Sequence, residues 1–267
     1  YPSHPSKVAM QIGKPSQLRT SISTATPDSI TVRNRDLCKE LIGQVSLTDF
    51  FCLLLTGQPP TDTQRLLLDA SLVSISEHGL VPSIQAARMT YAAAPEALQG
   101  AVAAGLLGCG SVVLGSSEEA GKLFAALLAK TPQEGTLAEV VEREISALRA
   151  RRAPLPGFGH PLHQQEDPRA TRLLALADEL GTAGENVRVL RAIAAAVPQI
   201  YGRALPINVS GAIPAVLLDV GFPLKALKGV PLVARSVSLV AHLLEESMEP
   251  IGFALAHAGE SAISYVA

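Results

Sequence analysis

The sequence predicts an all-α protein of about ten helices joined by short loops. Nearly half of its 267 residues are apolar and only 17% are charged, which excludes disorder as the main state. The apolar excess is mostly Ala and Leu, which favour helix. Capping residues recur before segments of helical periodicity, and Gly or Pro follows many of them. Because no long strand alternation or internal repeat is visible, a doubly wound α/β sheet is not expected.

The N-terminal region carries the one extended piece that we expect. Residues 1–22 are polar and contain several Pro and Ser, which predicts an arm or loop. The β-branched residues at 30–32 favour a short strand over residues 29–32. After it, the run Ser46 to Asp49 is typical of a capping box and predicts a helix over residues 50–56, closed by Gly57.

Helical periodicity dominates the rest of the chain. Thr61 and Thr136 start capping-box patterns, Pro95 is expected at the first position of a helix, and Asp167 is expected to cap the helix that Pro168 begins. The predicted helices cover residues 61–77, 83–93, 95–107, 118–130, 136–151, 167–180, 185–197, 211–220, 230–245 and 251–258.

Composition excludes several partners and compartments. A net charge of −2, 4% aromatic residues and no Trp give no basis for binding nucleic acid or an acidic membrane surface. Three Cys without metal or disulfide spacing indicate a reducing compartment, so we expect a cytoplasmic protein without a metal. No window of about 18 uninterrupted apolar residues occurs in the sequence, so we expect no membrane span. The apolar surplus also indicates surface buried between subunits, as in a homodimer or higher homo-oligomer.

The loop from Pro156 to His163, with Arg169 in the first turn of the next helix, is the strongest candidate for a chemical site. A helix N-terminus together with a guanidinium would bind an oxyacid. The His160 imidazole could donate a hydrogen bond to a carbonyl oxygen or accept a proton from a hydroxyl. The alternative is a surface loop in which His160 is incidental and Arg169 pairs with Glu166.

Gly157-x-Gly159-His160-Pro161, followed by Asp-Pro-Arg169 nine residues after the His, resembles the signature of the citrate synthase / citryl-CoA lyase family. The segments 29–37 and 41–60 are similar to the N-terminal region of that family. Glu77-His78-Gly79 with the helix after it, and Arg235 with the His and Glu pair that follow it, are similar to two further family segments. The resemblance covers the chain from about residue 20 to residue 246.

This resemblance implies a fold and a set of domains. The expected fold is citrate synthase-like, with a large helical domain formed by residues 1–110 and 210–267 and a smaller mobile helical domain formed by residues 111–209. The chain is close in size to free-standing citryl-CoA lyases and much shorter than typical citrate synthases. Closure of the smaller domain would exclude water from the site.

The same resemblance implies roles for individual residues. His160 would polarise a carbonyl group, or take the hydroxyl proton in the cleavage direction. Arg169, Arg235 and His78 would bind the carboxylates of a small di- or tricarboxylate. The loop residues Pro156, Gly157, Phe158 and Gly159 would bind CoA, whose thioester is a substrate, so no further cofactor is implied. Without the resemblance, His78 is a histidine at a helix C-terminus and Arg235 belongs to a buried or interface ion pair.

Two positions depart from the family pattern. The stretch 112–118 holds no His, although the family has one there that stabilises the enolate of acetyl-CoA. Ser210 stands where the family has its catalytic Asp, and a Ser hydroxyl cannot act as the base that removes a thioester α-proton. Three explanations remain: Glu118, Glu119 or His163 has taken over the base role, the substrate differs, or the protein binds CoA esters without catalysis.

The preferred hypothesis is a CoA-thioester C–C lyase or acyltransferase that cleaves or forms citryl-CoA, or a similar 3-hydroxyacyl-CoA, from acetyl-CoA and a 2-oxoacid such as oxaloacetate. The rival from another class is a non-catalytic CoA-ester- or oxyacid-binding or regulatory protein, motivated by Ser210. A third hypothesis is an all-α interaction protein in which His160 and Arg169 are structural.

Overall fold

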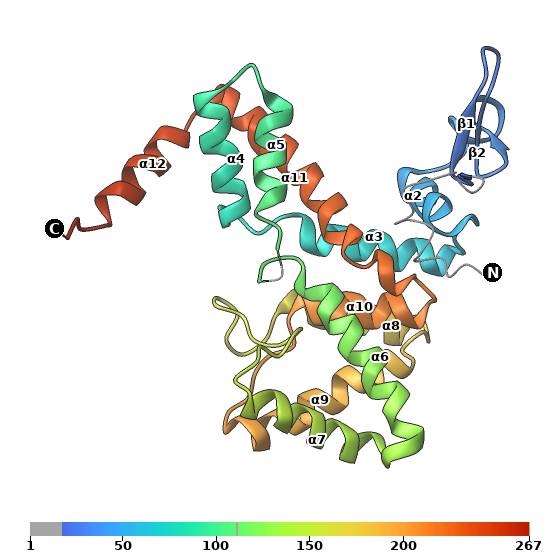
Figure 1. The fold of residues 1–267 in the computed structure, drawn as a ribbon, viewed down its shortest axis with the longest axis vertical. Helices are drawn as coiled ribbons and strands as arrows, with labels where there is room; N and C mark the ends of the chain where they lie inside the picture. The colour runs from blue at the N-terminus through green and yellow to red at the C-terminus, as the bar shows by residue number, and fades with distance from the viewer. Residues whose placement is uncertain (1–17, 111, 267) are drawn as a thin grey trace. The chain divides into compact units, whose positions relative to one another are not determined.

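The structure is a computed structural model that describes residues 18–110 and 112–266 (Figure 1). The chain divides into two compact units, residues 1–60 and residues 61–267. Residues 1–22 were predicted to form an arm or loop, and residues 1–17 of that segment lie outside the described residues. The predicted division into residues 1–110 with 210–267 and residues 111–209 stays a prediction.

The first unit contains a small antiparallel sheet. Its strands are β1 (Ser23–Ala25), β2 (Ile30–Val32) and β3 (Arg35–Asp36), in the order β1-β2-β3. Thr31 of β2 is opposite Thr24 on one side and Asp36 on the other. The strand expected at residues 29–32 is therefore confirmed, as the centre of this sheet.

A π-helical turn (Leu37–Leu41) and α2 (Leu47–Thr56) complete the first unit. The Ser46 hydroxyl accepts a hydrogen bond from the Asp49 N–H, and the Asp49 carboxylate accepts one from the Ser46 N–H, so the predicted capping box is present. The unit buries a small core. Val32, Leu41 and Leu53 form that core.

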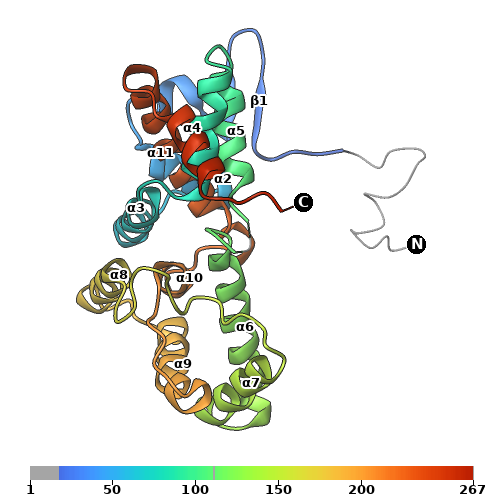
Figure 2. The same ribbon diagram turned by 90° about the vertical axis from the view of Figure 1, so that its left-hand side faces the viewer.

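The second unit is helical throughout its regular structure (Figures 1 and 2). Its elements are α3 (Asp62–Ser76), α4 (Pro82–Ala93), α5 (Leu98–Leu107), α6 (Ser116–Glu134), α7 (Leu137–Ala150), α8 (Pro168–Glu179), α9 (Glu185–Tyr201), α10 (Val209–Asp219), a 3-10 turn (Leu224–Ala226), α11 (Gly229–Met248) and α12 (Gly252–Ser261). The helical fold class predicted from the sequence is confirmed.

Two groups of helices pack within the second unit, and α3 contacts both. The first group is α4, α5 and α11, with α12 against α4. Its core is Ile84, Ala87, Ala101, Leu239 and Leu243. The second group is α6 to α10, in which α10 is buried along most of its length. α3 packs on α11 of the first group and on α10 and α8 of the second group. It therefore joins the two groups of helices.

Proline positions account for the main differences from the predicted helix boundaries. α5 begins at Leu98 and not at Pro95, while α6 and α9 continue through Pro132 and Pro198 to end at Glu134 and Tyr201. A proline in the last turn of a helix removes only one backbone hydrogen bond near the end. Because the loss is limited to that one bond, both helices continue two or three residues past the proline, and the two predicted ends were too early.

Residues 224–248, which include α11, are long and apolar enough to cross a membrane by length and composition alone, with a mean hydropathy of 1.3. However, 44% of the most apolar window is buried within the protein. Its helix also buries the charged side chains of Arg235 and Glu246, each only 2% exposed. These contacts fit a core helix.

Candidate functional site

The glycine-rich loop that contains His160 is fixed to the segment before α10. Gly159 N–H donates to the Pro206 carbonyl at 2.8 Å, and Asn208 N–H donates to the Gly157 carbonyl at 3.0 Å. The Asn208 side-chain amide also donates to the Gly159 carbonyl at 2.7 Å. Phe158 thereby pairs with Ile207 in an antiparallel bridge. Backbone hydrogen bonds and the Asn208 side chain therefore hold the loop against this segment.

Two glycines allow this close approach. A Cβ atom on Gly157 would lie 2.7 Å from the Cα of Gly211, and one on Gly211 would lie 2.6 Å from the Gly157 carbonyl oxygen. Gly157 also has a φ of +85°, which L side chains rarely adopt. Gly159 has a similar φ of +78°, but a Cβ there would meet no atom of the described residues within 4 Å.

A cavity of about 650 Å³ opens beside the loop. The four residues predicted to bind CoA, Pro156, Gly157, Phe158 and Gly159, all line it. Its other lining residues are Val112, Ser116, Glu119, Lys122, Leu123, Leu148, Pro154, Leu155 and Asn208. The size is that of a typical small-molecule site, and the lining is mostly apolar with a few polar groups. The CoA-binding role of the loop stays a prediction.

Three imidazoles converge at the end of this loop. His78 follows α3, and its ring lies 5.2 Å from that of His160 and 5.3 Å from that of His163, measured between ring centroids. His160 and His163 are closer, at 4.5 Å. The Nε2 atoms of His78 and His163 lie 3.2 Å apart and share a hydrogen bond. Residues 85 positions apart in the sequence therefore meet at one site.

The hydrogen bonds of His160 define its tautomer. Its Nδ1 accepts the backbone N–H groups of Leu162 at 3.1 Å and His163 at 3.0 Å. A neutral imidazole whose Nδ1 accepts carries its proton on Nε2. Burial lowers the pKa of His160, and the neighbouring His163 and Arg169 lower it further, so the neutral form is favoured. His160 thus presents an Nε2–H donor.

A second donor faces the same point. The Nη2 of Arg169 lies 3.4 Å from the Nε2 of His160, although a guanidinium and an Nε2–H group are both donors. An oxygen atom between them would accept from both. This pair is therefore suited to a carbonyl, alkoxide or carboxylate oxygen.

Asp167 holds the Arg169 guanidinium in place. Its buried carboxylate accepts hydrogen bonds from the Nε and Nη2 of Arg169, each at 2.9 Å, and from the Arg169 backbone N–H at 3.1 Å. It also accepts the Val209 N–H, the first of α10, at 2.9 Å. The alternative hypothesis paired Arg169 with Glu166, but the structure pairs Arg169 with Asp167. The cap at Asp167 was predicted, but its second role was not.

Arg235 is buried close by and incompletely paired. Its side chain is 2% exposed, its Nη1 lies 3.5 Å from the Ser238 hydroxyl, and its Nε has no hydrogen-bond partner among the described residues. Burial lowers the pKa of Arg235 from its usual value, the negative charge of Glu77 opposes that effect, and Arg169 adds to it. A buried guanidinium with an unused donor is suited to an anionic ligand.

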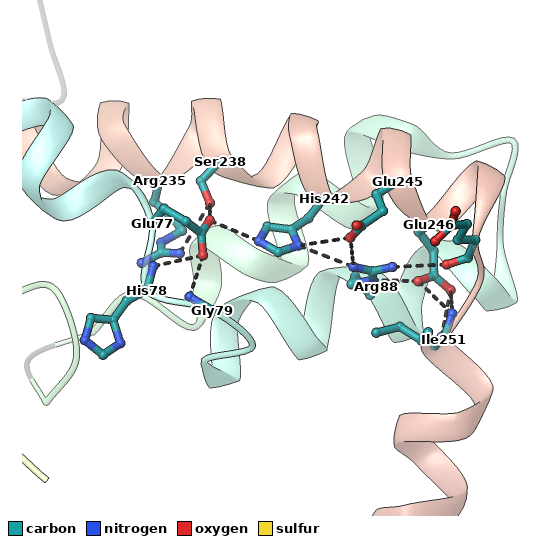
Figure 3. Close-up of polar contacts among 12 residues, drawn as sticks. Glu77, His78, Gly79, Arg88, Arg235, Ser238, His242, Glu245, Glu246 and Ile251 are labelled. Atoms are coloured by element: carbon teal, nitrogen blue, oxygen red, sulfur yellow. Dashed lines mark hydrogen bonds and ion pairs between the residues drawn. The ribbon is translucent and has the colours of Figure 1, made fainter. Parts of the chain in front are cut away.

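Glu77 ties His78 to α11 (Figure 3). One carboxylate oxygen accepts the backbone N–H groups of His78 at 2.8 Å and Gly79 at 2.6 Å. The other accepts the Ser238 hydroxyl at 2.5 Å and the Nε2–H of His242 at 3.0 Å. These four bonds fix the turn that directs the His78 ring towards His160, so His78 is not bound to the end of its own helix.

The network continues along α11 to α12 (Figure 3). Arg88 forms ion pairs with Glu245 at 2.5 Å and Glu246 at 2.6 Å, and its Nη1 lies 3.4 Å from the Nδ1 of His242. The Glu246 carboxylate in turn accepts the N–H groups of Ile251 and Gly252 at the start of α12. Figure 3 shows that these side chains form one continuous row, which supports the backbone around His78.

Ser210 is the second residue of α10 and is 9% exposed. Its neighbour Val209 is the residue whose N–H donates to Asp167. The position is therefore at the buried helix end that the Asp167 contact fixes. The structure gives no base at residue 210 itself, because a hydroxyl group is the only titratable function there.

A metal fits this site poorly. His78, His160 and His163 bring ring nitrogens within 4.8 Å of one another, a grouping that zinc sites also show. However, the Nδ1 of His160 already accepts two N–H groups, its Nε2 carries the proton, and the Arg169 cation faces it. This arrangement disfavours a cation and favours an anion.

Of the predicted substrate site, the structure brings His78, His160 and Arg169 together, with the buried Arg235 near enough for its charge to interact with that of Arg169. Sequence reasoning did not assign site roles to Asp167, Glu77 or His242. The sequence signal that could have identified Glu77 and Asp167 is their position next to His78 and close to Arg169. The predicted roles of all these residues in binding and catalysis stay predictions.

We expect Gly157→Ala to destabilise the protein more than Gly159→Ala. Both variants place Ala at a positive φ, which costs on the order of 1 kcal/mol, but only residue 157 would also press its Cβ against a backbone. Urea unfolding of the two variants and the wild type measures the difference. Equal losses of stability would contradict the close approach of the loop to α10.

We also expect the stability of the protein to fall as the pH drops from 7 towards 5. Burial is the largest cause that lowers the pKa values of His78 and His160 below 6.5. Below pH 6.5 the unfolded chain then binds more protons than the folded one, so acidification favours unfolding. His160→Asn, which keeps an acceptor for the two backbone N–H groups, should flatten the dependence of Tm on pH. His257→Asn, at an exposed position on α12, is the control, and an unchanged slope in His160→Asn would contradict this account.

The sequence profile "Citrate synthase, C-terminal domain" matches residues 18–251. A citrate synthase of Heyndrickxia coagulans is 23% identical over 233 residues, which are 86% of this chain and 60% of that protein. The chain thus spans less than two thirds of that relative.

Two solved structures are similar over most of the chain. The citryl-CoA lyase of Hydrogenobacter thermophilus is 30% identical, with a TM-score of 0.76 over 86% of this chain and 87% of that one. The ATP citrate lyase of Methanothrix soehngenii, solved with citrate and coenzyme A, has a TM-score of 0.76 at 17% identity; the match covers all of this chain and 44% of that one. With a family profile over most of its length and a helical fold shared with these enzymes, the chain belongs to the citrate synthase family.

Proposed function

We propose that the protein is a CoA-thioester C–C lyase or acyltransferase. It would cleave or form citryl-CoA, or a similar 3-hydroxyacyl-CoA, from acetyl-CoA and a 2-oxoacid such as oxaloacetate. The observation that carries this proposal is that two hydrogen-bond donors face the same small space. The Nε2 of His160 and the Nη2 of Arg169 lie 3.4 Å apart. The family to which the chain belongs comprises citrate synthases and citryl-CoA lyases, which act on CoA thioesters by C–C bond chemistry.

The charges of the site suit a di- or tricarboxylate. Asp167 orients the Arg169 guanidinium, and Arg235 has a buried donor with no partner among the described residues. A carboxylate accepts two N–H groups from a guanidinium in one plane, which makes such pairs strong and directional. His78, held by the Glu77 network, adds a third group that could contact the same ligand.

The tautomer of His160 supports a donor role in both reaction directions. In the synthesis direction its Nε2–H would polarise the carbonyl of the 2-oxoacid. In the cleavage direction the same N–H would stabilise the alkoxide oxygen as the C–C bond breaks. As a neutral ring with Nδ1 engaged by two backbone N–H groups, it is poorly suited to take the hydroxyl proton itself.

The cavity beside the loop supports the CoA side of the proposal. It borders Pro156 to Gly159, so a thioester bound there would lie next to His160. The similar ATP citrate lyase was solved with citrate and coenzyme A, and the similar lyase at 30% identity is a citryl-CoA lyase. CoA would thus act as a substrate carrier and no separate cofactor is required.

The second candidate function is binding of a CoA ester or oxyacid without turnover. Ser210 favours it, because the position holds no carboxylate to act as a base. All the groups that would bind a ligand are retained in this case. The two functions differ only in turnover, which a direct assay measures.

We expect the purified protein to release oxaloacetate from citryl-CoA, and His160→Ala to lower kcat by about 10²–10³-fold, the usual loss when an oxyanion donor is removed. His257→Ala is the matched control on the exposed face of α12. Calorimetry with citrate and CoA on each variant separates binding from turnover. Ligand binding with equal background rates in wild type and His160→Ala would favour the binding function over the enzyme.

We further propose a homodimer, formed through α11. Val237, Val240, Leu244 and Met248 are spaced along one side of this helix and are 62%, 52%, 61% and 66% exposed. Their spacing of three and four residues produces one apolar stripe. An exposed apolar stripe on a helix whose opposite face is core is typical of a subunit interface.

We expect Leu244→Glu to convert a dimer into a monomer in light scattering, because a carboxylate would have to be desolvated at the interface. Leu47→Glu, at a leucine on α2 that is 75% exposed, is the control and should leave the oligomeric state unchanged. A dimer of unchanged affinity in Leu244→Glu would rule out this face of α11.

A further inference from the structure

The proposed reaction takes one proton from an oxygen atom and delivers one proton to a carbon atom. In cleavage, the tertiary hydroxyl loses its proton, and the α-carbon of the leaving thioester gains one. The pattern of the family has a carboxylate at position 210 for the carbon side, but this chain has a serine. If the proposed function holds, another described side chain near His160 has to carry the proton.

Asp167 is unsuited to this task. Burial acts to raise its pKa, but the hydrogen bonds from Arg169 and Val209 and the Arg169 charge lower it overall. Both carboxylate oxygens are engaged by these donors. A carboxylate in that state is a weak base, and protonating it would break the contact that orients Arg169.

Glu77 is also engaged. Its carboxylate accepts four hydrogen bonds, from His78, Gly79, Ser238 and His242. Burial acts to raise its pKa, and these bonds outweigh burial and lower it. Protonation of Glu77 would release the turn that positions His78, so this group supports the site and does not react.

The two acids of α6 are bound elsewhere. Glu118 and Glu119 each pair with the Lys122 ammonium, at 3.2 and 2.9 Å. Glu119 lines the cavity beside the loop and is about half exposed. In the part of the chain that the structure describes, neither carboxylate contacts one of the three imidazoles, so neither is linked to His160 and Arg169.

His163 differs from these acids in its contacts. Its ring lies 4.5 Å from that of His160, and its Nε2 shares a hydrogen bond with the Nε2 of His78 at 3.2 Å. That bond joins two imidazoles, so the proton in it can be carried by either ring. An imidazole also accepts and returns protons near neutral pH, as a carrier must.

We propose that His163 carries the reacting proton in place of a carboxylate at position 210. In cleavage, a ring nitrogen of His163 takes the hydroxyl proton, the C–C bond breaks and the oxygen becomes a ketone. The electron pair of that bond passes to the thioester enolate, which takes the same proton from the His163 imidazolium at its α-carbon. The products are a 2-oxoacid and an acyl-CoA, and no further reactant is needed.

The test compares wild type with His163→Asn in two assays. The first follows oxaloacetate release from citryl-CoA, and the second follows deuterium entry into the methyl group of acetyl-CoA in D₂O with oxaloacetate present. We expect His163→Asn to lower kcat and exchange by about 10²–10⁴-fold, as for loss of a general acid or base, with the Kd for citrate nearly unchanged. Imidazole should partly restore activity to His163→Ala.

A double variant makes the test specific. Ser210→Asp combined with His163→Asn should recover exchange that His163→Asn alone has lost, because a carboxylate then provides the carrier. Thermal unfolding confirms that each variant folds, and His257→Asn is the control histidine.

The outcomes separate the two proposals. A wild type that cleaves citryl-CoA, with an equally active His163→Asn, overturns the carrier role and leaves the proposed function intact. A fall in citrate affinity that accounts for the whole loss would make His163 a positioning residue, which also overturns it. A wild type that neither cleaves nor exchanges overturns the proposed function, and the carrier role with it.

Discussion

The buried carboxylate of Asp167 is the contact on which the candidate site depends. It caps α8 through the Arg169 N–H, binds the Arg169 guanidinium through two further bonds, and accepts the first N–H of α10 from Val209. One group thus joins two helices and orients the cation between them. Because Asp167 is fully buried, each of these donors would lose a charged partner without it, and buried donors without partners are costly.

The start of α10, which Asp167 holds, is also where the glycine loop approaches most closely. Gly157 and Gly211 allow two backbones to approach where any Cβ would clash, and Asn208 joins them through both its amide and its backbone. The loop that carries His160 is therefore fixed to the same helix end that Asp167 holds. Rigid placement of this kind is what a site needs to act on a reacting oxygen.

The site as a whole has more hydrogen-bond donors than acceptors. His160 and Arg169 direct donors at each other, and within residues 18–110 and 112–266 no acceptor pairs with the buried Nε–H of Arg235. Such an arrangement lowers the stability of the folded chain alone, because buried cations are desolvated without full compensation. Conflicts of this kind occur at functional sites, where a ligand completes the pairing. An anion with more than one carboxylate would do so here.

Local signals explain how much of the fold could be predicted. The capping boxes at Ser46, Thr61 and Thr136 are all present, because each needs only residues three positions apart. The predicted ends of α6 and α9 were wrong because Pro132 and Pro198 were taken as helix stops, whereas a proline in the last turn removes only one backbone hydrogen bond. The resemblance to a family gave the architecture, which periodicity alone did not.

The candidate site was predicted in part for the same reason. The motif around His160 and Arg169 identified the loop, yet a sequence cannot distinguish Glu166 from Asp167 as the partner of Arg169. Only the fold shows that Asp167 faces inward and Val209 reaches it. Likewise, His163 was one of three candidates for the base, and its contact with His78 depends on two segments meeting in space.

A change from a carboxylate to an imidazole as proton carrier has an electrostatic consequence. A carboxylate base is negative before it takes the proton and neutral after, whereas an imidazole is neutral before and positive after. The proposed imidazole carrier therefore adds positive charge to a site that already holds the Arg169 and Arg235 cations, and a bound tricarboxylate adds negative charge there. The loss of a carboxylate at residue 210 thus need not abolish the reaction, and the exchange of carrier would favour polyanionic substrates.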